Sequence, residues 1–311
     1  MSDWSGRHTR CYRVTHRTEY RYSDVVTNSY GRGFLRPRDC ERQRCLAHEL
    51  RIDPAPADSS LSRDVYGNVS SYFQITDPHR TLTITSASIV EVDPPPADHY
   101  ERGAARAPWE AARPAGPGGA RAVEFTLDLN PPEITDEVRA YAAPSFVRAR
   151  PLIEVLRDLA ARIYRDFTYR SGSTTVSTGV HEMLAAREGV CQDFARLAIA
   201  CLRANGLAAG YVSGYLATDP PPGKERMIGA DATHAWAAVW TPQDRWLEFD
   251  PTNDQMVDER YIVVGRGRDY ADVPPLRGII YTNSESSVID VAVDVVPCAE
   301  EVPPARHRQR Q

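Results

Sequence analysis

Three side chains in the second half of this sequence are of the types that let a thiol attack an acyl carbon. Cys191 lies in Gly-Val-Cys-Gln-Asp-Phe, His234 in Thr-His-Ala-Trp and Asp250 in Glu-Phe-Asp-Pro-Thr-Asn. A thiol nucleophile needs a base that takes its proton, and the base needs a carboxylate that orients it. The three residues, in this order, predict a catalytic triad for cysteine-dependent acyl transfer.

Cys191 is expected in the first turn of a helix. Apolar residues recur after it with helical spacing, and Asn205-Gly206 supplies a stop; the apolar stripe is Phe194, Leu197, Ala198, Cys201 and Leu202. The first turn of a helix has unpaired backbone N-H groups and the positive end of the helix dipole. Both favour a thiolate, and the N-H groups can donate hydrogen bonds to an oxyanion.

His234 and Asp250 are expected on the two strands of a hairpin, at residues 234–240 and 246–250, joined by residues 241–245. This register places both side chains on one face, diagonal to each other and within reach of a hydrogen bond.

The register follows from pairing Trp240 with Trp246, which sets Asp250 opposite Trp236. The other face carries small and apolar residues and is the expected core side: Ala235, Ala237, Val239, Leu247 and Phe249. We therefore expect the helix of Cys191 to cover the face of His234 and Asp250.

Each of the three residues alone also has a structural explanation. A helical cysteine is commonly a small buried apolar residue, a histidine at a strand start is commonly a cap, and an aspartate before Pro-Thr-Asn commonly stabilises a turn. Their joint occurrence with matching geometry favours catalysis.

The three segments resemble the core of the transglutaminase-like superfamily, a papain-related fold that includes animal transglutaminases and bacterial proteins described as candidate cysteine proteases. Other segments resemble the β-rich N-terminal domain and the C-terminal part of the bacterial branch: residues 12–22, 35–38, 64–68, 78–79 and 267–278. The resemblance covers roughly residues 10–296. It implies that Cys191, His234 and Asp250 occupy the catalytic positions of the family.

Two aromatic residues are candidates for binding. Animal transglutaminases place a tryptophan side chain in the oxyanion hole, and this sequence has no evident counterpart. Tyr169, in an expected upstream strand, is a candidate, although a core or surface tyrosine explains it as well. Trp236 lies on the expected face of the triad with Trp240 and Trp246. These tryptophans line an amine tunnel or pack as hairpin aromatics.

The predicted fold class is α+β with two domains. Short alternating runs predict an all-β, sandwich-like domain at residues 10–93, and Pro, Ala and Gly dominate a mobile linker at residues 94–122. Residues 123–296 form the papain-like domain, in which the helix bearing the cysteine packs on an antiparallel sheet, and residues 297–311 form a tail.

Within the second domain, a helix is expected around residues 152–163, and residues 261–264 and 288–296 are expected as closing strands. Residues 217–233 precede His234 as a loop that is expected to lie over the acyl site.

Length, composition and the apolar runs of the sequence indicate where in the cell the protein is expected. With 311 residues, of which 42% are hydrophobic and 25% charged, the chain can bury sizeable cores. It has no apolar run long enough to cross a bilayer and no apolar stretch of a signal peptide, so the expected location is the cytoplasm, without membrane association. The six cysteines are then expected to be reduced.

Charge and ligand patterns favour neither nucleic acid nor metal as a partner. The net charge is -5, and the arginines of the basic stretch at residues 7–51 alternate as on a solvated sheet, without an aromatic platform for bases. Cys40, Cys45 and His48 lack a fourth zinc ligand at suitable spacing. No metal or cofactor is expected.

Three functions remain open. A thioester at Cys191 is attacked by a primary amine, which exchanges or crosslinks amides, or by water, which makes the protein a peptidase or amidase; the triad is the same in both. Alternatively, the protein is a non-catalytic binding or assembly module on this scaffold. The resemblance implies a peptide or isopeptide amide as substrate and a functional link to ATP-grasp-type amide ligases.

Overall fold

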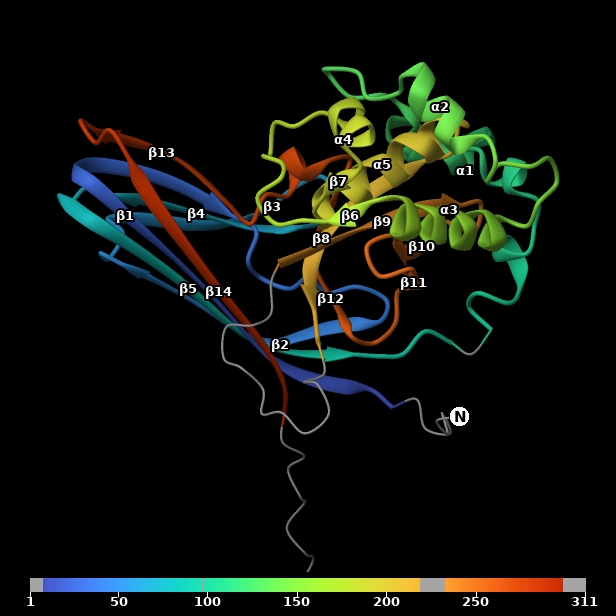
Figure 1. The fold of residues 1–311 in the computed structure, drawn as a ribbon. Helices are drawn as coiled ribbons and strands as arrows, with labels where there is room; N and C mark the ends of the chain where they lie inside the picture. Colours follow the sequence, from blue (N-terminus) through green and yellow to red (C-terminus); the bar gives the residue numbers. More distant parts are fainter. Residues whose placement is uncertain (1–7, 97, 219–232, 299–311) are drawn as a thin grey trace, which may run out of the picture.

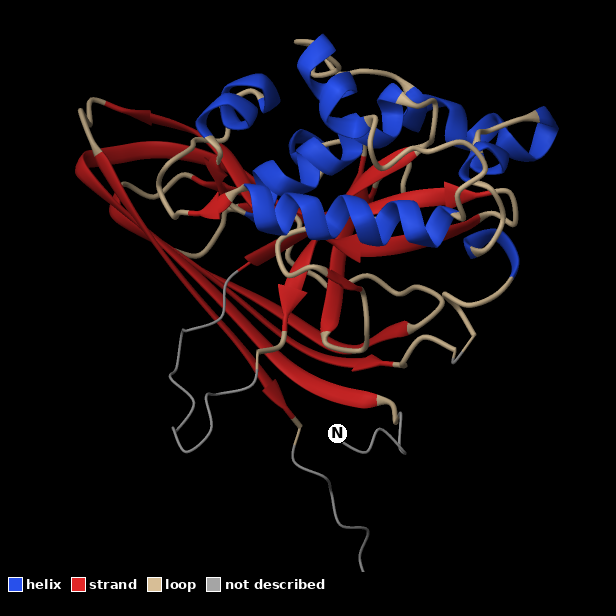
Figure 2. Ribbon diagram, turned by 45° about the vertical axis from the view of Figure 1, so that its right-hand side comes forward, coloured by secondary structure: helices blue, strands red, loops and turns tan. Residues whose placement is uncertain are grey.

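The computed structural model describes residues 8–96, 98–218 and 233–298. The chain forms two large antiparallel sheets, and helices cover one side of the second (Figures 1 and 2). The predicted α+β fold class is confirmed. No helix in the described ranges is both long and apolar enough to cross a membrane.

The N-terminal region is all β, as predicted, but its strands form one curled sheet and not a sandwich of two sheets. The strand order is β2-β5-β1-β4-β3, and β13 and β14 are added by pairing with β1. Its strands are β1 (Arg10–Gly33), β2 (Gln43–Asp53), β3 (Asp58–Arg63), β4 (Val69–Ile75), β5 (His79–Val92), β13 (Leu276–Thr282) and β14 (Ser287–Pro297). The long β1 organises it. The first part of β1 pairs with β5 and β14, and its last part pairs with β4 and β13.

The last two strands correct the sequence analysis. Residues 288–296 were expected to close the second sheet, but β14 pairs with Tyr12–Tyr22 of β1, in the first sheet. An alternating apolar pattern identifies a strand with one covered face, but it does not say which sheet the strand joins. The other expected closing strand, at residues 261–264, does lie at an edge of the second sheet.

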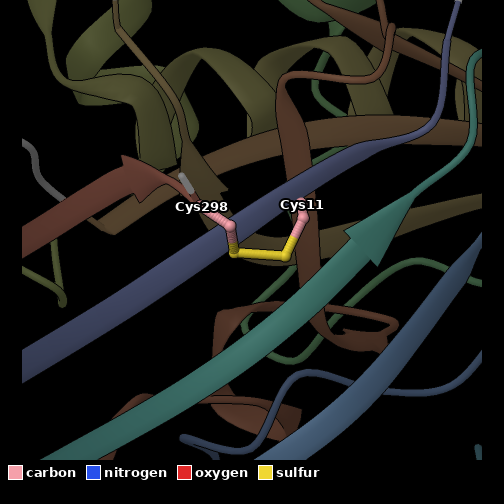
Figure 3. The surroundings of a disulfide bond; sticks show 2 residues. All are labelled: Cys11 and Cys298. Carbon is pink, nitrogen blue, oxygen red and sulfur yellow. A yellow bond between two sulfur atoms is a disulfide. The ribbon is translucent and has the colours of Figure 1, made fainter. Parts of the chain in front are cut away.

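A disulfide bond joins the two ends of the described chain. Cys11, at the start of β1, is bonded to Cys298, which follows β14, with their Cα atoms 5.3 Å apart (Figure 3). The backbone N-H of Cys298 also donates a hydrogen bond to the carbonyl oxygen of Cys11 (2.8 Å). The expectation of six reduced cysteines is therefore wrong. The cytoplasmic location from which it was inferred stays a prediction, and a disulfide gives it no support.

The second sheet has the order β11-β10-β9-β8-β12. Its strands are β8 (Ala209–Leu216), β9 (Thr233–Thr241), β10 (Arg245–Asp250), β11 (Gln255–Met256) and β12 (Tyr261–Gly267). The longer helices of the chain are α2 (Asp136–Ala142), α3 (Leu152–Asp166), α4 (Val180–Ala186) and α5 (Cys191–Ala204). A small parallel bridge pairs β6 (Thr168–Tyr169) with β7 (Glu188–Gly189). The helix expected around residues 152–163 is α3.

The described part of the segment at residues 94–122 is packed against the core, in contrast to the mobile linker expected there. It carries the short 3-10 turns η1 (Gly103–Ala105) and η2 (Trp109–Ala112), the single turn α1 (Gly116–Gly119) and the start of η3 (Ala120–Thr126). Trp109 is buried against Phe146, and its Nε1 donates to the carbonyl oxygen of Val147 (2.9 Å). Single turns bury residues one at a time, so they leave no periodic signal in the sequence.

The two sheets meet through apolar residues of β1 and β14 that pack on Tyr215 of β8 and Ile262 of β12. At this contact His16 is buried, with Nδ1 3.0 Å from the Tyr215 hydroxyl, and burial lowers the pKa of His16 to about 4. Gln43 extends the contact, since its side chain accepts from the backbone N-H of Val263 and donates to the carbonyl oxygen of the same residue (2.7 Å each). The first sheet is thus bonded directly to the sheet that carries His234.

Candidate active site

Cys191 is the first residue of α5, as predicted. The Asp193 carboxylate holds the turn before it, because Oδ2 accepts hydrogen bonds from the backbone N-H of Val190 (2.9 Å) and from the Thr174 hydroxyl (2.6 Å). A side chain at Gly189 would be crowded, since a Cβ there would lie 3.0 Å from Cβ of Asp193 and 3.1 Å from Cγ of Met183. The backbone turn that leads to Cys191 is therefore held by its hydrogen bond to Asp193 and by the close packing at Gly189.

The predicted hairpin is confirmed. Trp240 pairs with Trp246, and Phe249 pairs with Ala237. His234 Nε2 lies 2.7 Å from Asp250 Oδ2, which is a hydrogen bond between the two residues expected to form the base and its orienting carboxylate.

The position of α5 corrects the sequence analysis. The helix packs on the face of Ala235, Ala237 and Val239, not on the face of His234 and Asp250. Alanines on the central strand let a helix approach closely, and the long apolar stripe of α5 needs that covered face. His234 still reaches the helix, because it is only the second residue of β9, at the end of the sheet.

The thiol of Cys191 lies near the imidazole of His234, since it is among the causes that raise the pKa of this histidine. Since Nε2 is taken by Asp250, Nδ1 is the nitrogen that remains for the thiol. Burial alone would lower the pKa of His234, but its hydrogen bond to Asp250, together with its contact with Cys191, raises the pKa to about 10. The site therefore favours the imidazolium form of His234 despite its burial.

Asp250 is completely buried and held on every side. Its carboxylate accepts hydrogen bonds from the Tyr261 hydroxyl (2.7 Å), the Asn253 amide (2.7 Å) and the backbone N-H of Thr252 (2.8 Å). Burial raises the pKa of Asp250, but the hydrogen bonds from His234, Asn253 and Tyr261 outweigh it, and the net pKa is lowered. The carboxylate stays ionised where its role requires it.

Sequence reasoning missed Asn253 and Tyr261. The run Asp-Pro-Thr-Asn does signal a turn, in which Asp250 bonds the backbone two residues on. Tyr261 comes from β12, which is not adjacent to β10 in the sheet, so nothing in the sequence links it to Asp250.

The two candidate binding residues have different outcomes. Trp236 is completely buried behind the site and donates from Nε1 to Glu248 (2.8 Å), which contradicts a direct contact with substrate. Tyr169 is 54% exposed and pairs with Gly189 next to the Cys191 turn. Its ring contacts Phe194, and its pKa is raised by burial and by the nearby Cys191. The position of Tyr169 suits substrate contact, and its role stays a prediction.

Two other expectations concern the surroundings of the site. Most of the loop expected over the acyl site, residues 219–232, lies outside the described residues. Within the described ranges, the acidic, cysteine and histidine side chains form no group of three or more that could hold a metal ion.

Comparison with known proteins places the chain. Residues 12–91 match the bacterial transglutaminase-like N-terminal region, and residues 139–251 match the transglutaminase-like superfamily. A protein of Mycobacterium tuberculosis is 79% identical over 297 residues, which is 94% of each chain, and one of Mycobacterium leprae is 35% identical over 92% of this chain and 99% of its own.

Two relatives carry functional names. A protein-glutamine gamma-glutamyltransferase of Pseudomonas aeruginosa is 31% identical over 153 residues, which cover 42% of this chain and 23% of that protein. The crystal structure of a protein from Cytophaga hutchinsonii, provisionally named a cysteine protease, has the same fold, with a TM-score of 0.68 over 93% of both chains at 18% identity. With both of its regions matched and the fold shared, the chain belongs to the transglutaminase-like superfamily.

Proposed function

We propose that this protein is a cysteine-dependent acyltransferase or amidase that forms a thioester at Cys191 with a peptide or isopeptide amide. The observation that carries the proposal is the chain of contacts from Asp250 through His234 to Cys191 at the start of α5. In the first step the Cys191 thiolate attacks the amide carbonyl carbon, and a new C-S bond forms. The His234 imidazolium then protonates the leaving nitrogen as the C-N bond breaks.

In the second step neutral His234 takes a proton from the acceptor, which attacks the thioester carbon. The C-S bond breaks, and the Cys191 thiolate and the His234 imidazolium are restored. Water as acceptor gives a free carboxylate, and a primary amine gives a new amide. Asp250 keeps the imidazole oriented in both steps and remains ionised. The backbone N-H groups of the first turn of α5, with Tyr169 beside them, are the proposed donors to the oxyanion.

The proposed substrate class is a peptide or protein amide, with a primary amine as a second substrate if transfer prevails. Support comes from the name of the Pseudomonas relative, which acts on protein glutamine, and from the provisional name of the Cytophaga protein. A functional link to ATP-grasp-type amide ligases remains part of this proposal.

A library of Gln- and Asn-containing peptides, incubated with the protein with and without a primary amine, tests the proposal through ammonia release and product mass. Both reactions release ammonia from the amide. Hydrolysis leaves a carboxylate on the peptide, whereas transfer leaves an amide that carries the added amine, so the two products differ in mass. Cys191→Ala must abolish both, and Cys45→Ala, which changes a thiol on the first sheet, is the matched control. The proposal fails if neither the wild type nor Cys45→Ala gives a product with any peptide or isopeptide amide. If both proteins also bind such an amide as tightly as Cys191→Ala binds it, the non-catalytic binding function replaces the proposal.

A further inference from the structure

A cavity lies at the end of the second sheet opposite to His234. Its volume is about 400 Å³, and it is lined by three parts of the chain: the loops of the first sheet that carry Arg38 and Tyr66, the segment with Arg121 and Phe125, and strands β8, β9, β10 and β12. Trp240, next to the last residue of β9, is one of the residues that line the cavity. Cys191, His234 and Asp250 do not line the cavity, and six residues of extended strand, about 20 Å, separate Trp240 from His234. Tyr211 is the lining residue nearest to the candidate active site, since burial and then the nearby Cys191 raise its pKa.

Two guanidinium groups in the cavity wall have unused donors. Arg38 donates from Nη1 to the Asn68 side-chain oxygen (2.9 Å) and from Nη2 to the backbone carbonyl oxygen of Tyr66 (3.1 Å), and Arg266 donates to the buried Glu248 carboxylate. The Nε of each arginine is enclosed and has no acceptor among the described residues, whereas other atoms of both side chains line the cavity. A buried cation whose donors are not all satisfied favours a bound anion at the part of the side chain that faces the cavity.

The electrostatics of the wall favour an anion as that acceptor. Burial, and after it the positive charge of Arg266, lowers the pKa of Arg38, which shows that the two cations lie close together. Glu248 offsets only one of them directly. A third arginine, Arg121, lies exposed at the rim.

Two carboxylates at the rim do not cancel this preference. Glu124 accepts a hydrogen bond from the Tyr66 hydroxyl (3.2 Å), and Asp244 accepts one from Nε1 of Trp240 (3.0 Å). Both residues are exposed, where water screens their charge, whereas Arg38 and Arg266 are partly buried.

The rest of the lining is aromatic. The ring of Phe125 lies 5.0 Å from that of Trp246 and 5.5 Å from that of Tyr66, centre to centre, and the Trp240 ring completes the set. Flat rings beside a cationic wall suit a ligand with a planar apolar part and a charged end. A volume of about 400 Å³ is within the usual range for small-molecule pockets.

We propose that this cavity binds a small molecule that carries one anionic group, a carboxylate or a phosphate, on an aromatic ring. The anion lies against the Arg38 and Arg266 side chains where they line the cavity, and the ring lies among Phe125, Trp240 and Trp246. The proposal is independent of the chemistry at Cys191.

Intrinsic fluorescence tests the proposal directly, because two tryptophans line the cavity. The full-length protein is titrated with benzoate and with phenyl phosphate, and benzyl alcohol and inorganic phosphate serve as controls that lack the charge or the ring. We expect saturable quenching by at least one aromatic anion and at least ten-fold weaker binding of both controls. If benzoate binds more tightly, the site prefers a carboxylate; if phenyl phosphate binds more tightly, the site prefers a phosphate.

Variants locate the site. Arg38→Gln is expected to weaken binding at least ten-fold, and Arg121→Gln, at the exposed rim, about two- to five-fold. Arg148→Gln, which changes an exposed arginine away from the cavity, should leave the affinity unchanged. If Arg38→Gln does not fold, Arg121→Gln carries the test alone. The proposal is overturned if no aromatic anion quenches saturably at 10 mM or below, about the weakest affinity of interest, or if affinity is equal in every folded variant.

Discussion

At the scale of single residues, the candidate active site is organised by the buried carboxylate of Asp250. The ionised Asp250, held by three donors besides His234, makes an imidazolium stable despite its burial. The protonation state of His234 thus depends on Asp250 and its three donors, none of which has a proposed contact with a substrate.

Cys191 should be alkylated first among the free thiols. Cys201, on the same helix, is completely buried, which raises its pKa to about 12, and burial also raises the pKa of Cys45. Only the thiolate reacts, so brief treatment with iodoacetamide at neutral pH, followed by peptide mass spectrometry, should find the label on Cys191. Faster labelling of Cys40 or Cys45 in the folded protein would refute the assignment of the nucleophile.

Asp250→Asn should lower turnover and shift its pH dependence. In serine triads the equivalent change costs about 10⁴ in rate, and a thiol that ionises readily is expected to lose less. The hydrogen bond to Asp250 is the main cause that raises the pKa of His234 to about 10, against burial. Without it the imidazolium loses its proton at lower pH, so the alkaline limb of the rate profile should move to lower pH.

The matched control is Asp254→Asn, which alters a carboxylate four residues away that is not bonded to His234. An alkaline limb that moves equally in both variants would show that general charge, not the hydrogen bond, sets the pKa of His234.

The residues of the triad were predictable because their signals are local. A side-chain period of two places His234 and Asp250 on one face once Trp240 pairs with Trp246. The supports of Asp250 were not all predictable, since Tyr261 reaches it from a strand that no pairing rule connects to β10.

At the scale of secondary-structure elements, the turn that leads into α5 sets the position of the thiol. It is closed by Asp193 within the helix and by β6 beside it, and Gly189 fits only because it lacks a side chain. The fit is tight enough that one added methyl group must displace the turn or its neighbours.

Gly189→Ala is therefore expected to destabilise the protein by about 1 to 3 kcal/mol, the usual cost of overpacking, and to slow the alkylation of Cys191. Gly118→Ala is the control, because a Cβ there would meet nothing within 4 Å. Urea unfolding gives the first quantity, and the rate of iodoacetamide labelling gives the second. Equal stability and equal labelling in the two variants would show that the turn adapts freely.

How the elements pack on one another was harder to predict than where each element lies in the sequence. The start of α5 and both strands of the hairpin followed from periodicity and turn residues, but the face on which α5 packs did not. We inferred it from the polar pair, whereas packing is decided by the larger apolar surface, which Ala235 and Ala237 open to the helix.

At the scale of the whole molecule, β1 joins the beginning of the chain to its end. It pairs along its length with β13 and β14, and the Cys11–Cys298 bond fastens the outer end of this pairing (Figures 1 and 3). The bond closes a loop with a sequence separation of 287 residues.

Removal of this disulfide should lower the free energy of unfolding by about 2 to 5 kcal/mol, because a long loop is freed in the unfolded chain. The double variant Cys11→Ser/Cys298→Ser, or the wild type in a reductant, should show it as a lower midpoint of unfolding. Cys40→Ser serves as the control, and reductant should not change the midpoint of the double variant. A midpoint that is the same with and without the bond would show that strand pairing alone holds the ends.

The pairing of β1 with the last strands also has a consequence for the order in which the protein is made. Residues 10–33 are synthesised long before residues 276–297, which are the partners of one whole edge of that strand. The first sheet therefore cannot be completed until residue 297 has left the ribosome, although the sheet with His234 can form before it. Until then, the edge of β1 is an exposed template for pairing, and a nascent chain stalled before residue 276 offers it to other chains.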